Sequence, residues 1–253
     1  MLNFVEYGKE NKYDDDIFFQ KYSQMSRSQQ GLAGAGEWET LRKLLPDFKD
    51  KRVLDLGCGY GWHCIYAMEH GASSVVGVDI SHKMLEVAKE KTHFPQVEYK
   101  CCAIEDVEFP EESFDVILSS LAFHYVADYE ILVKKIYRIL KSGGKLVFTV
   151  EHPVFTAYGT QDWYYNEKGE ILHFPVDNYY YEGKRTAVFL GEKVTKFHRT
   201  LTTYLNTLLS NGFIINHIVE PQPPEYMMDI PGMQDEMRRP MMLIVSANKK
   251  VDR

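Results

Sequence analysis

The chain has 253 residues and a formal net charge of −7. That length allows roughly 70–75% of the unfolded surface to be buried in one large domain. The acidic balance disfavours a nucleic-acid partner, which would need a basic face. The four cysteines form no C-x-x-C pair, the first residues show no signal-peptide pattern, and no apolar run reaches the length of a membrane span. These features predict a cytoplasmic protein with no nucleic-acid or membrane partner.

Residues 1–50 are predicted to form a helical cap of two helices, and strands alternate with helices in residues 51–153. The apolar runs predict strands at Arg52–Leu56, Val75–Asp79, Val97–Cys101, Phe114–Ser119 and Lys145–Val150. Ser81 and Asp128 are expected to cap two of the helices between them, and Gly143-Gly144 to end the second. Apolar strands separated by helices indicate a parallel sheet covered on both faces. Its strands then end at one edge, where ligands bind.

The remainder of the chain divides into an aromatic-rich insertion, residues 154–197, and a C-terminal helix and strands, residues 198–253. One predicted helix face carries Leu201, Tyr204, Leu205, Leu208 and Leu209, and Gly212 follows as its carboxyl cap. Two further strands are predicted at Phe213–Val219 and Met241–Ala247. We therefore expect a single domain over residues 1–253, in which the insertion serves as a lid or as a contact between subunits.

The run from Val53 to Gly61 predicts a ligand-binding loop. A buried strand ends near Asp55 and is followed by Gly57, Cys58, Gly59 and then Gly61, just before a predicted helix. Such a loop lets a ligand approach bare backbone at a helix amino end. A dinucleotide fingerprint needs its third glycine one position later, where this chain has Trp62, and a P-loop needs a Lys-Ser/Thr that is absent. A glycine-rich turn with no ligand is the simpler alternative.

A second acid, Asp79, ends the next predicted strand, 22 residues after Gly57. A carboxylate at that place can accept both hydroxyls of a ribose. The alternative is that Asp79 only caps the following helix, although Ser81 is better placed for that. This acid alone would equally suit a nicotinamide dinucleotide, so the spacing of the glycines is needed to distinguish the two kinds of ligand.

The pattern D-x-G-x-G-x-G from Asp55 to Gly61 resembles the first motif of class I S-adenosylmethionine (SAM)-dependent methyltransferases. The Phe114-Asp115-Val116-Ile117 strand start and the segment Ser119–Tyr125 are similar to later motifs of that family. The resemblance implies an α/β, three-layer, doubly wound sandwich. Its seven-stranded, mostly parallel sheet would have an antiparallel last strand inserted between the fifth and sixth strands. It also implies SAM as the cofactor of residues 51–153, with S-adenosylhomocysteine as product.

The same resemblance implies a set of cofactor-binding residues. Asp55, Gly57, Cys58, Gly59 and Gly61 would form the loop, and Asp79 with Ile80 would hold the ribose. Ala103 stands where members often have an aspartate, so Ile104 and Glu105 would contact the adenine. Ser119 would lie under the methionine part of SAM. Tyr13, Tyr22 and Arg27 of the cap would close over its carboxylate.

The resemblance implies methyl transfer to an O, N or C nucleophile of a small molecule, without a metal. His124 and His152 follow two strand ends and are the candidates for a general base. The alternatives are a Rossmann-type NAD(P)-dependent oxidoreductase, a non-catalytic SAM-binding regulator, and a methyltransferase with a macromolecular acceptor. The oligomeric state is expected to be monomer or homodimer.

Overall fold

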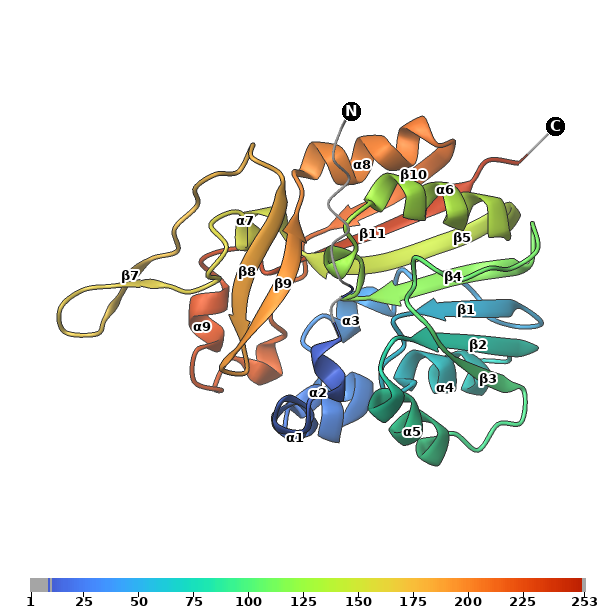
Figure 1. Cartoon of the computed structure of the whole chain (residues 1–253), viewed down its shortest axis with the longest axis horizontal. Coiled ribbons are helices and arrows are strands. Elements are labelled where there is room, and N and C mark those ends of the chain that lie inside the picture. The colour runs from blue at the N-terminus through green and yellow to red at the C-terminus, as the bar shows by residue number, and fades with distance from the viewer. Residues whose placement is uncertain (1–8, 10, 252–253) are drawn as a thin grey trace.

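The computed structural model describes residue 9 and residues 11–251, and a seven-stranded sheet runs through its centre (Figure 1). The strand order is β10-β11-β5-β4-β1-β2-β3. The bounds are β1 (Arg52–Leu56), β2 (Ser74–Asp79), β3 (Val97–Cys101), β4 (Phe114–Ser120), β5 (Leu140–Glu151), β10 (Phe213–Val219) and β11 (Met242–Lys249). The pairs among β1 to β5 are parallel, and β11 is antiparallel to both neighbours. The predicted sheet, with its late strand inserted between β5 and β10, is confirmed.

Helices cover both faces of the sheet because alternate strand residues point to opposite sides. Leu54 and Leu56 pack in one apolar cluster with α6 (Tyr129–Ile139) and α8 (Leu201–Ser210). Val53 packs in the other cluster, with α3 (Trp38–Leu41), α4 (Trp62–Glu69) and α5 (His82–Lys91). The result is the predicted three-layer sandwich. No helix in the described part of the chain is long and apolar enough to cross a membrane.

Both predicted amino-terminal caps are present. The Ser81 hydroxyl accepts a hydrogen bond from the Met84 N–H at 3.1 Å, and the Asp128 carboxylate accepts one from the Ile131 N–H at 2.9 Å. The predicted end of α6 at Gly143-Gly144 is wrong, because Leu140 is already extended and opens β5. The two glycines lie within β5, where the register with β4 shifts between Phe114 and Val116.

The predicted face of α8 is also partly wrong. Tyr204 and Leu208 are buried as expected, but the Leu209 side chain is 53% exposed. Leu209 therefore points away from the sheet, and only part of the apolar pattern serves the core.

The cap consists of short helices instead of the predicted pair. The described residues form η1 (Lys12–Asp14), α1 (Asp16–Ser23), α2 (Ser26–Gln29), η2 (Gly31–Gly34) and α3. Residues 1–8 and 10 of the predicted cap lie outside the described part of the chain. Asp15 caps α1 by accepting the Phe18 N–H at 3.0 Å, and the glycines at 31, 34 and 36 interrupt the second half of the segment.

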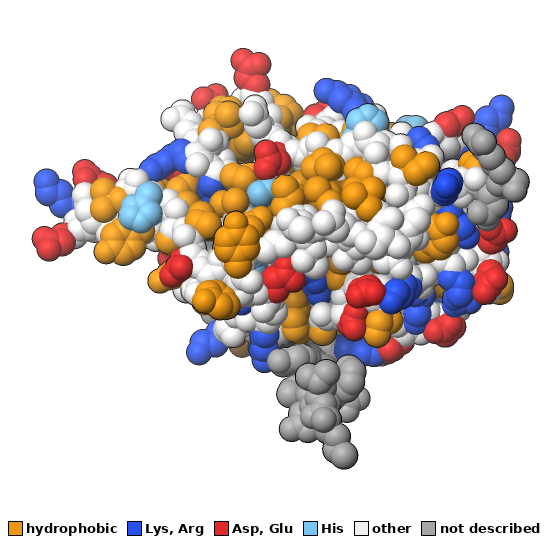
Figure 2. All heavy atoms as spheres, turned by 90° about the horizontal axis from the view of Figure 1, so that it is seen from above, with side chains coloured by type: hydrophobic (Ala, Val, Ile, Leu, Met, Phe, Trp, Pro, Cys, Tyr) orange, Lys and Arg blue, Asp and Glu red, His pale blue; other side chains and the backbone are white. Residues whose placement is uncertain are grey.

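The insertion begins with α7 (Pro153–Thr156) and then forms two hairpins. They are β6 (Tyr164–Tyr165) with β7 (Ile171–His173), and β8 (Gly183–Phe189) with β9 (Glu192–His198). The β6–β7 hairpin protrudes from the rest of the molecule (Figure 1) and contributes to the hydrophobic surface seen in Figure 2, with exposed Tyr164 and Leu172. After β10 the connection contains η4 (Glu225–Met227) and α9 (Met233–Glu236).

The β8–β9 hairpin packs on the cap. Phe18 of α1 is fully buried against Ala187 and Val194 of the hairpin. The Lys21 ammonium donates a hydrogen bond to the Leu190 carbonyl at 2.9 Å. Cap and hairpin thus meet across the carboxyl edge of the sheet, above the loop that follows β1.

Candidate functional site

The glycine loop after β1 has a backbone that other residues would not tolerate. Gly57 and Gly61 have φ angles of +78° and +74°. A Cβ on Gly57 would lie 2.4 Å from the Cβ of Ala122, and one on Gly61 would lie 2.1 Å from the hydroxyl of Tyr99. The loop therefore packs closely against Ala122, in the segment after β4, and against Tyr99 of β3, and its bare backbone remains on the open side.

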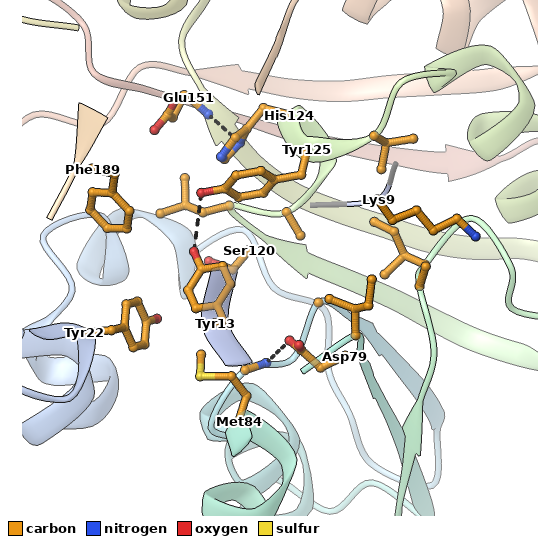
Figure 3. Close-up of a pocket in the computed structure, with 18 of the residues that line it drawn as sticks. Lys9, Tyr13, Tyr22, Asp79, Met84, Ser120, His124, Tyr125, Glu151 and Phe189 are labelled. Carbon is orange, nitrogen blue, oxygen red and sulfur yellow. Dashed lines mark hydrogen bonds between the residues drawn. The ribbon is translucent and has the colours of Figure 1, made fainter. Parts of the chain in front are cut away.

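A cavity of about 210 Å³ lies over this loop, between the carboxyl edge of the sheet, the cap and the β8–β9 hairpin (Figure 3). The predicted site residues that line it are Tyr13, Tyr22, Arg27, Gly57, Gly59, Asp79, Ile80, Ile104, Glu105 and His124. The predicted residues outside its lining are Asp55, Cys58, Gly61, Ser119 and His152. The first group thus lies around one cavity, whereas the second group lies outside its lining.

Asp79 is held rigidly at the tip of β2. One carboxylate oxygen accepts the Gly59 N–H at 2.9 Å, and the other accepts the Ser81 N–H at 2.9 Å. Burial raises the pKa of Asp79, and these N–H groups act in the opposite direction. Each oxygen keeps a further lone pair, so the carboxylate can accept two hydroxyls from a ligand in the cavity.

Asp55, at the end of β1, and Cys58, within the glycine loop, are both buried. Burial raises the pKa of Asp55 to about 7, and its nearest donor is the Cys64 thiol at 3.5 Å. Burial also raises the pKa of the Cys58 thiol. Cys58 lines a second cavity of about 80 Å³, which adjoins the first at the glycine loop.

The second cavity contains polar groups that have no partner in the protein. The Ser28 hydroxyl and the Trp62 indole nitrogen are both buried without a hydrogen bond, and both residues line this space. Arg27 lines both cavities and donates from Nη2 to the two Glu37 oxygens at 3.0 and 2.9 Å. Buried polar groups without a partner are rare, so this end of the site fits a strongly polar ligand group.

The two serines at the end of β4 differ in direction. The Ser119 hydroxyl donates to the Leu56 carbonyl at 2.7 Å inside the sheet, whereas Ser120 lines the cavity. Because side chains alternate along a strand, only one of two neighbours can face the ligand. The prediction named the one that faces the sheet.

The two candidate histidines lie in different surroundings. His124 lines the cavity, and burial lowers its pKa to about 4, so the ring is neutral at pH 7. Its Nδ1 accepts the Glu151 backbone N–H at 3.4 Å. His152 caps α7 by accepting the Val154 N–H at 3.0 Å, and its Nε2 lies 2.9 Å from the Glu220 carboxylate. His152 therefore has a structural environment outside the cavity.

Several lining residues had not been predicted. Glu151, Tyr125, Phe189, Met241 and Met242 line the cavity, and Figure 3 shows the first three at the end away from Asp79. Glu151 directly follows the predicted strand Lys145–Val150 at the ligand edge, so its position in the sequence could have indicated a site residue. Phe189 comes from the insertion, which was predicted to be either a lid or a contact between subunits. No group of three or more His, Cys, Asp or Glu residues within the described ranges is arranged to bind a metal ion.

Comparisons with known proteins agree with this geometry. A methyltransferase domain family matches residues 54–148. A SAM-dependent methyltransferase of Mesorhizobium loti has 41% identity and a TM-score of 0.80, covering 86% of this chain and 100% of that chain. A Listeria monocytogenes protein assigned to the same kind of enzyme has 58% identity and a TM-score of 0.83, covering 87% and 99%. An uncharacterized Haemophilus influenzae protein is 34% identical over 250 residues, 94% of this chain and 96% of its own length.

The sheet order, with its antiparallel strand between β5 and β10, and the glycine loop after β1 are those of a class I methyltransferase fold. Relatives at 58% and 41% identity over nearly their whole length extend this to the cofactor. The chain belongs to the class I SAM-dependent methyltransferase family, and SAM is its cofactor.

Proposed function

We propose that this methyltransferase transfers the methyl group of SAM to an O, N or C nucleophile of a small molecule, without a metal. One observation carries the proposal: the cavity continues past the cofactor-binding residues into a space roofed by the cap and the β8–β9 hairpin. A roofed cavity with aromatic walls suits a small acceptor better than a polymer.

We assign the cofactor to the part of the cavity nearest β1 and β2. Asp79 would accept the ribose hydroxyls, and Ile80, Ile104 and Glu105 would surround the adenine. Gly57 and Gly59 offer backbone to the methionine part, with Ser120 taking the place proposed for Ser119. Tyr22 and Arg27 would close over the carboxylate, next to the unpartnered Ser28 hydroxyl and Trp62 indole.

When bound, SAM supplies an electrophilic methyl group, so the protein has to align an acceptor with it. His124 is the histidine that lines the cavity and is the remaining candidate to contact the acceptor. His152 has both ring nitrogens engaged elsewhere and is not retained as a base.

We also propose that residues 1–253 act as one domain, in the cytoplasm, as a monomer or homodimer. Light scattering would give the number of subunits.

The experiment is a calorimetric titration with SAM and S-adenosylhomocysteine, followed by mass spectrometry for S-adenosylhomocysteine formed with a panel of metabolites. The account predicts saturable binding of both compounds and turnover with at least one acceptor, unaffected by chelators. Binding with no turnover across the panel would favour the regulator instead. Loss of activity on chelation would contradict metal independence.

A further inference from the structure

Six residues form what we call the acceptor chamber, the end of the cavity away from Asp79 (Figure 3). Figure 3 labels four of them, His124, Tyr125, Glu151 and Phe189. The other two lining residues are Met242, which pairs with Glu151 across β11 and β5, and its neighbour Met241, whose carbonyl accepts the His152 N–H. The six residues come from the loop after β4, the end of β5, the β8–β9 hairpin and the start of β11. Two rings and two methionines make most of its wall apolar. Its polar groups are the Glu151 carboxylate, the His124 ring and the Tyr125 hydroxyl.

The Glu151 carboxylate is clamped by two residues of the insertion. One oxygen accepts the Lys196 ammonium of β9, and the other accepts the Gln161 amide. The Lys196 ammonium also donates to the Gln161 carbonyl oxygen at 2.9 Å, which closes the triangle. The Lys196 side chain is only 3% exposed, and its ammonium lies 5.4 Å from the centre of the Phe189 ring. The clamp fixes the carboxylate in one orientation at the chamber wall.

The carboxylate keeps its charge and part of its capacity to accept hydrogen bonds. Burial raises the pKa of Glu151, but the charge interactions with His124 and Lys196 and the hydrogen bonds from Lys196 and Gln161 outweigh it, so the pKa lies below its usual range. Each oxygen has more than one acceptor site, and each receives one donor from the clamp. A ligand O–H or N–H can therefore still bind there.

His124 adds a neutral donor beside this acceptor. Its Nδ1 accepts the Glu151 backbone N–H, so the proton of the neutral ring is on Nε2. The cations that line the cavity among the described residues are Lys9 and Arg27, and both have carboxylate partners, Asp106 and Glu37. No cation of the described lining is thus left to pair with an anion in the chamber.

We propose that Glu151 is a specificity-determining residue: it selects an acceptor that carries a hydrogen-bond-donating O–H or N–H on an apolar, ring-sized body, and rejects carboxylates and phosphates. This rests on the proposed function, because it assumes that the chamber holds the methyl acceptor. A bound acceptor would donate to the Glu151 carboxylate and receive a hydrogen bond from His124 Nε2.

The test uses two probes of similar size, phenol and benzoate, titrated into protein saturated with S-adenosylhomocysteine and followed by NMR. The structure predicts that phenol binds at least tenfold more tightly than benzoate. Equal binding, a preference for benzoate or no detectable phenol binding would overturn the proposal. If calorimetry showed no binding of S-adenosylhomocysteine itself, that result would instead refute the proposed function.

The variant Glu151→Gln keeps the shape and removes the charge. We expect the ratio of phenol to benzoate affinity to fall about tenfold. Glu112→Gln is the matched control, because Glu112 also pairs with a buried lysine, Lys249, but lies outside the cavity. If Glu151 had only a structural role, Glu151→Gln would lower the unfolding temperature and leave the ratio of phenol to benzoate affinity unchanged. That result would contradict the proposal. The comparison of phenol with benzoate on the native protein tests the proposal even if the variant folds poorly.

Discussion

The two halves of the cavity are built in different ways. The half that we propose for the cofactor rests on the ends of β1 and β2, where backbone geometry and a single carboxylate shape the site. The half that we propose for the acceptor is assembled from segments far apart in the sequence, joined by side-chain contacts such as Lys196 with Glu151. The half at β1 and β2 therefore depends on local strand–loop–helix geometry. The half at Glu151 depends on how the cap and the insertion pack on the sheet.

The largest effect is expected where cap and hairpin meet. Phe18→Ala would remove a fully buried ring from its contact with Ala187 and Val194. Such truncations cost roughly 3–5 kcal/mol in a well-packed core. Hydrogen exchange should show lost protection in β8–β9, with β1 and β2 unchanged. Ile17→Ala is the control, because Ile17 in the same helix is 60% exposed. Equal loss of protection across the sheet would contradict the separation of the two halves.

A glycine substitution should break the cofactor half alone. Gly57→Ala would combine a left-handed backbone with a Cβ 2.4 Å from that of Ala122. We expect roughly 2–3 kcal/mol weaker SAM binding by calorimetry, given the strain of such a residue. Gly169→Ala has the same φ of +78° with nothing within 4 Å of its Cβ, and serves as the control for strain alone. Unchanged affinity in Gly57→Ala would refute the close-approach argument.

Removing the strand-tip acid should have a smaller effect. Asp79→Ala should weaken SAM binding by roughly 1–3 kcal/mol, the value of lost hydrogen bonds to a charged group. The preference for phenol over benzoate should persist, because Asp79 lies outside the acceptor chamber. Asp235→Ala, in α9, is the control. A change in the probe preference without a change in SAM affinity would reverse the assignment of the two halves.

The smallest effect is a dependence of stability on pH. His124 has a pKa of about 4 in the folded protein because of burial, against roughly 6.5 when unfolded. The unfolded state therefore binds more protons between these values, and stability falls as the pH drops from 6.5 toward 4. His124→Gln should remove roughly 1–2 kcal/mol of the stability difference between pH 7 and pH 5 in urea denaturation. His63, with a similarly lowered pKa, remains in this variant and keeps part of the slope. An unchanged slope would contradict a buried neutral His124.

Sequence reasoning succeeded where structure is local. The caps at Ser81 and Asp128 and the place of Asp79 at a strand end follow from short-range patterns, whereas the strand order was supplied by the family resemblance. The resemblance implied Ser119, but β4 extends one residue beyond the predicted strand, to Ser120, and Ser120 lines the cavity. One residue of error turns a side chain to the other face.

The acceptor half could not be predicted in the same way. The contact of Lys196 with Glu151 joins residues 45 positions apart, and neither belongs to a motif. Aromatic residues in the insertion suggested both a lid and a subunit contact. The structure places β8–β9 over the cavity and leaves β6–β7 protruding, so composition alone could not separate the two roles.

The most direct test is a crystal structure of the protein with S-adenosylhomocysteine. The account predicts that both ribose hydroxyls lie within hydrogen-bond distance of the Asp79 carboxylate, and that the sulfur faces the chamber of His124, Tyr125 and Glu151. A ligand whose ribose lies away from Asp79, or whose body fills that chamber, would contradict the division of the cavity on which the account depends.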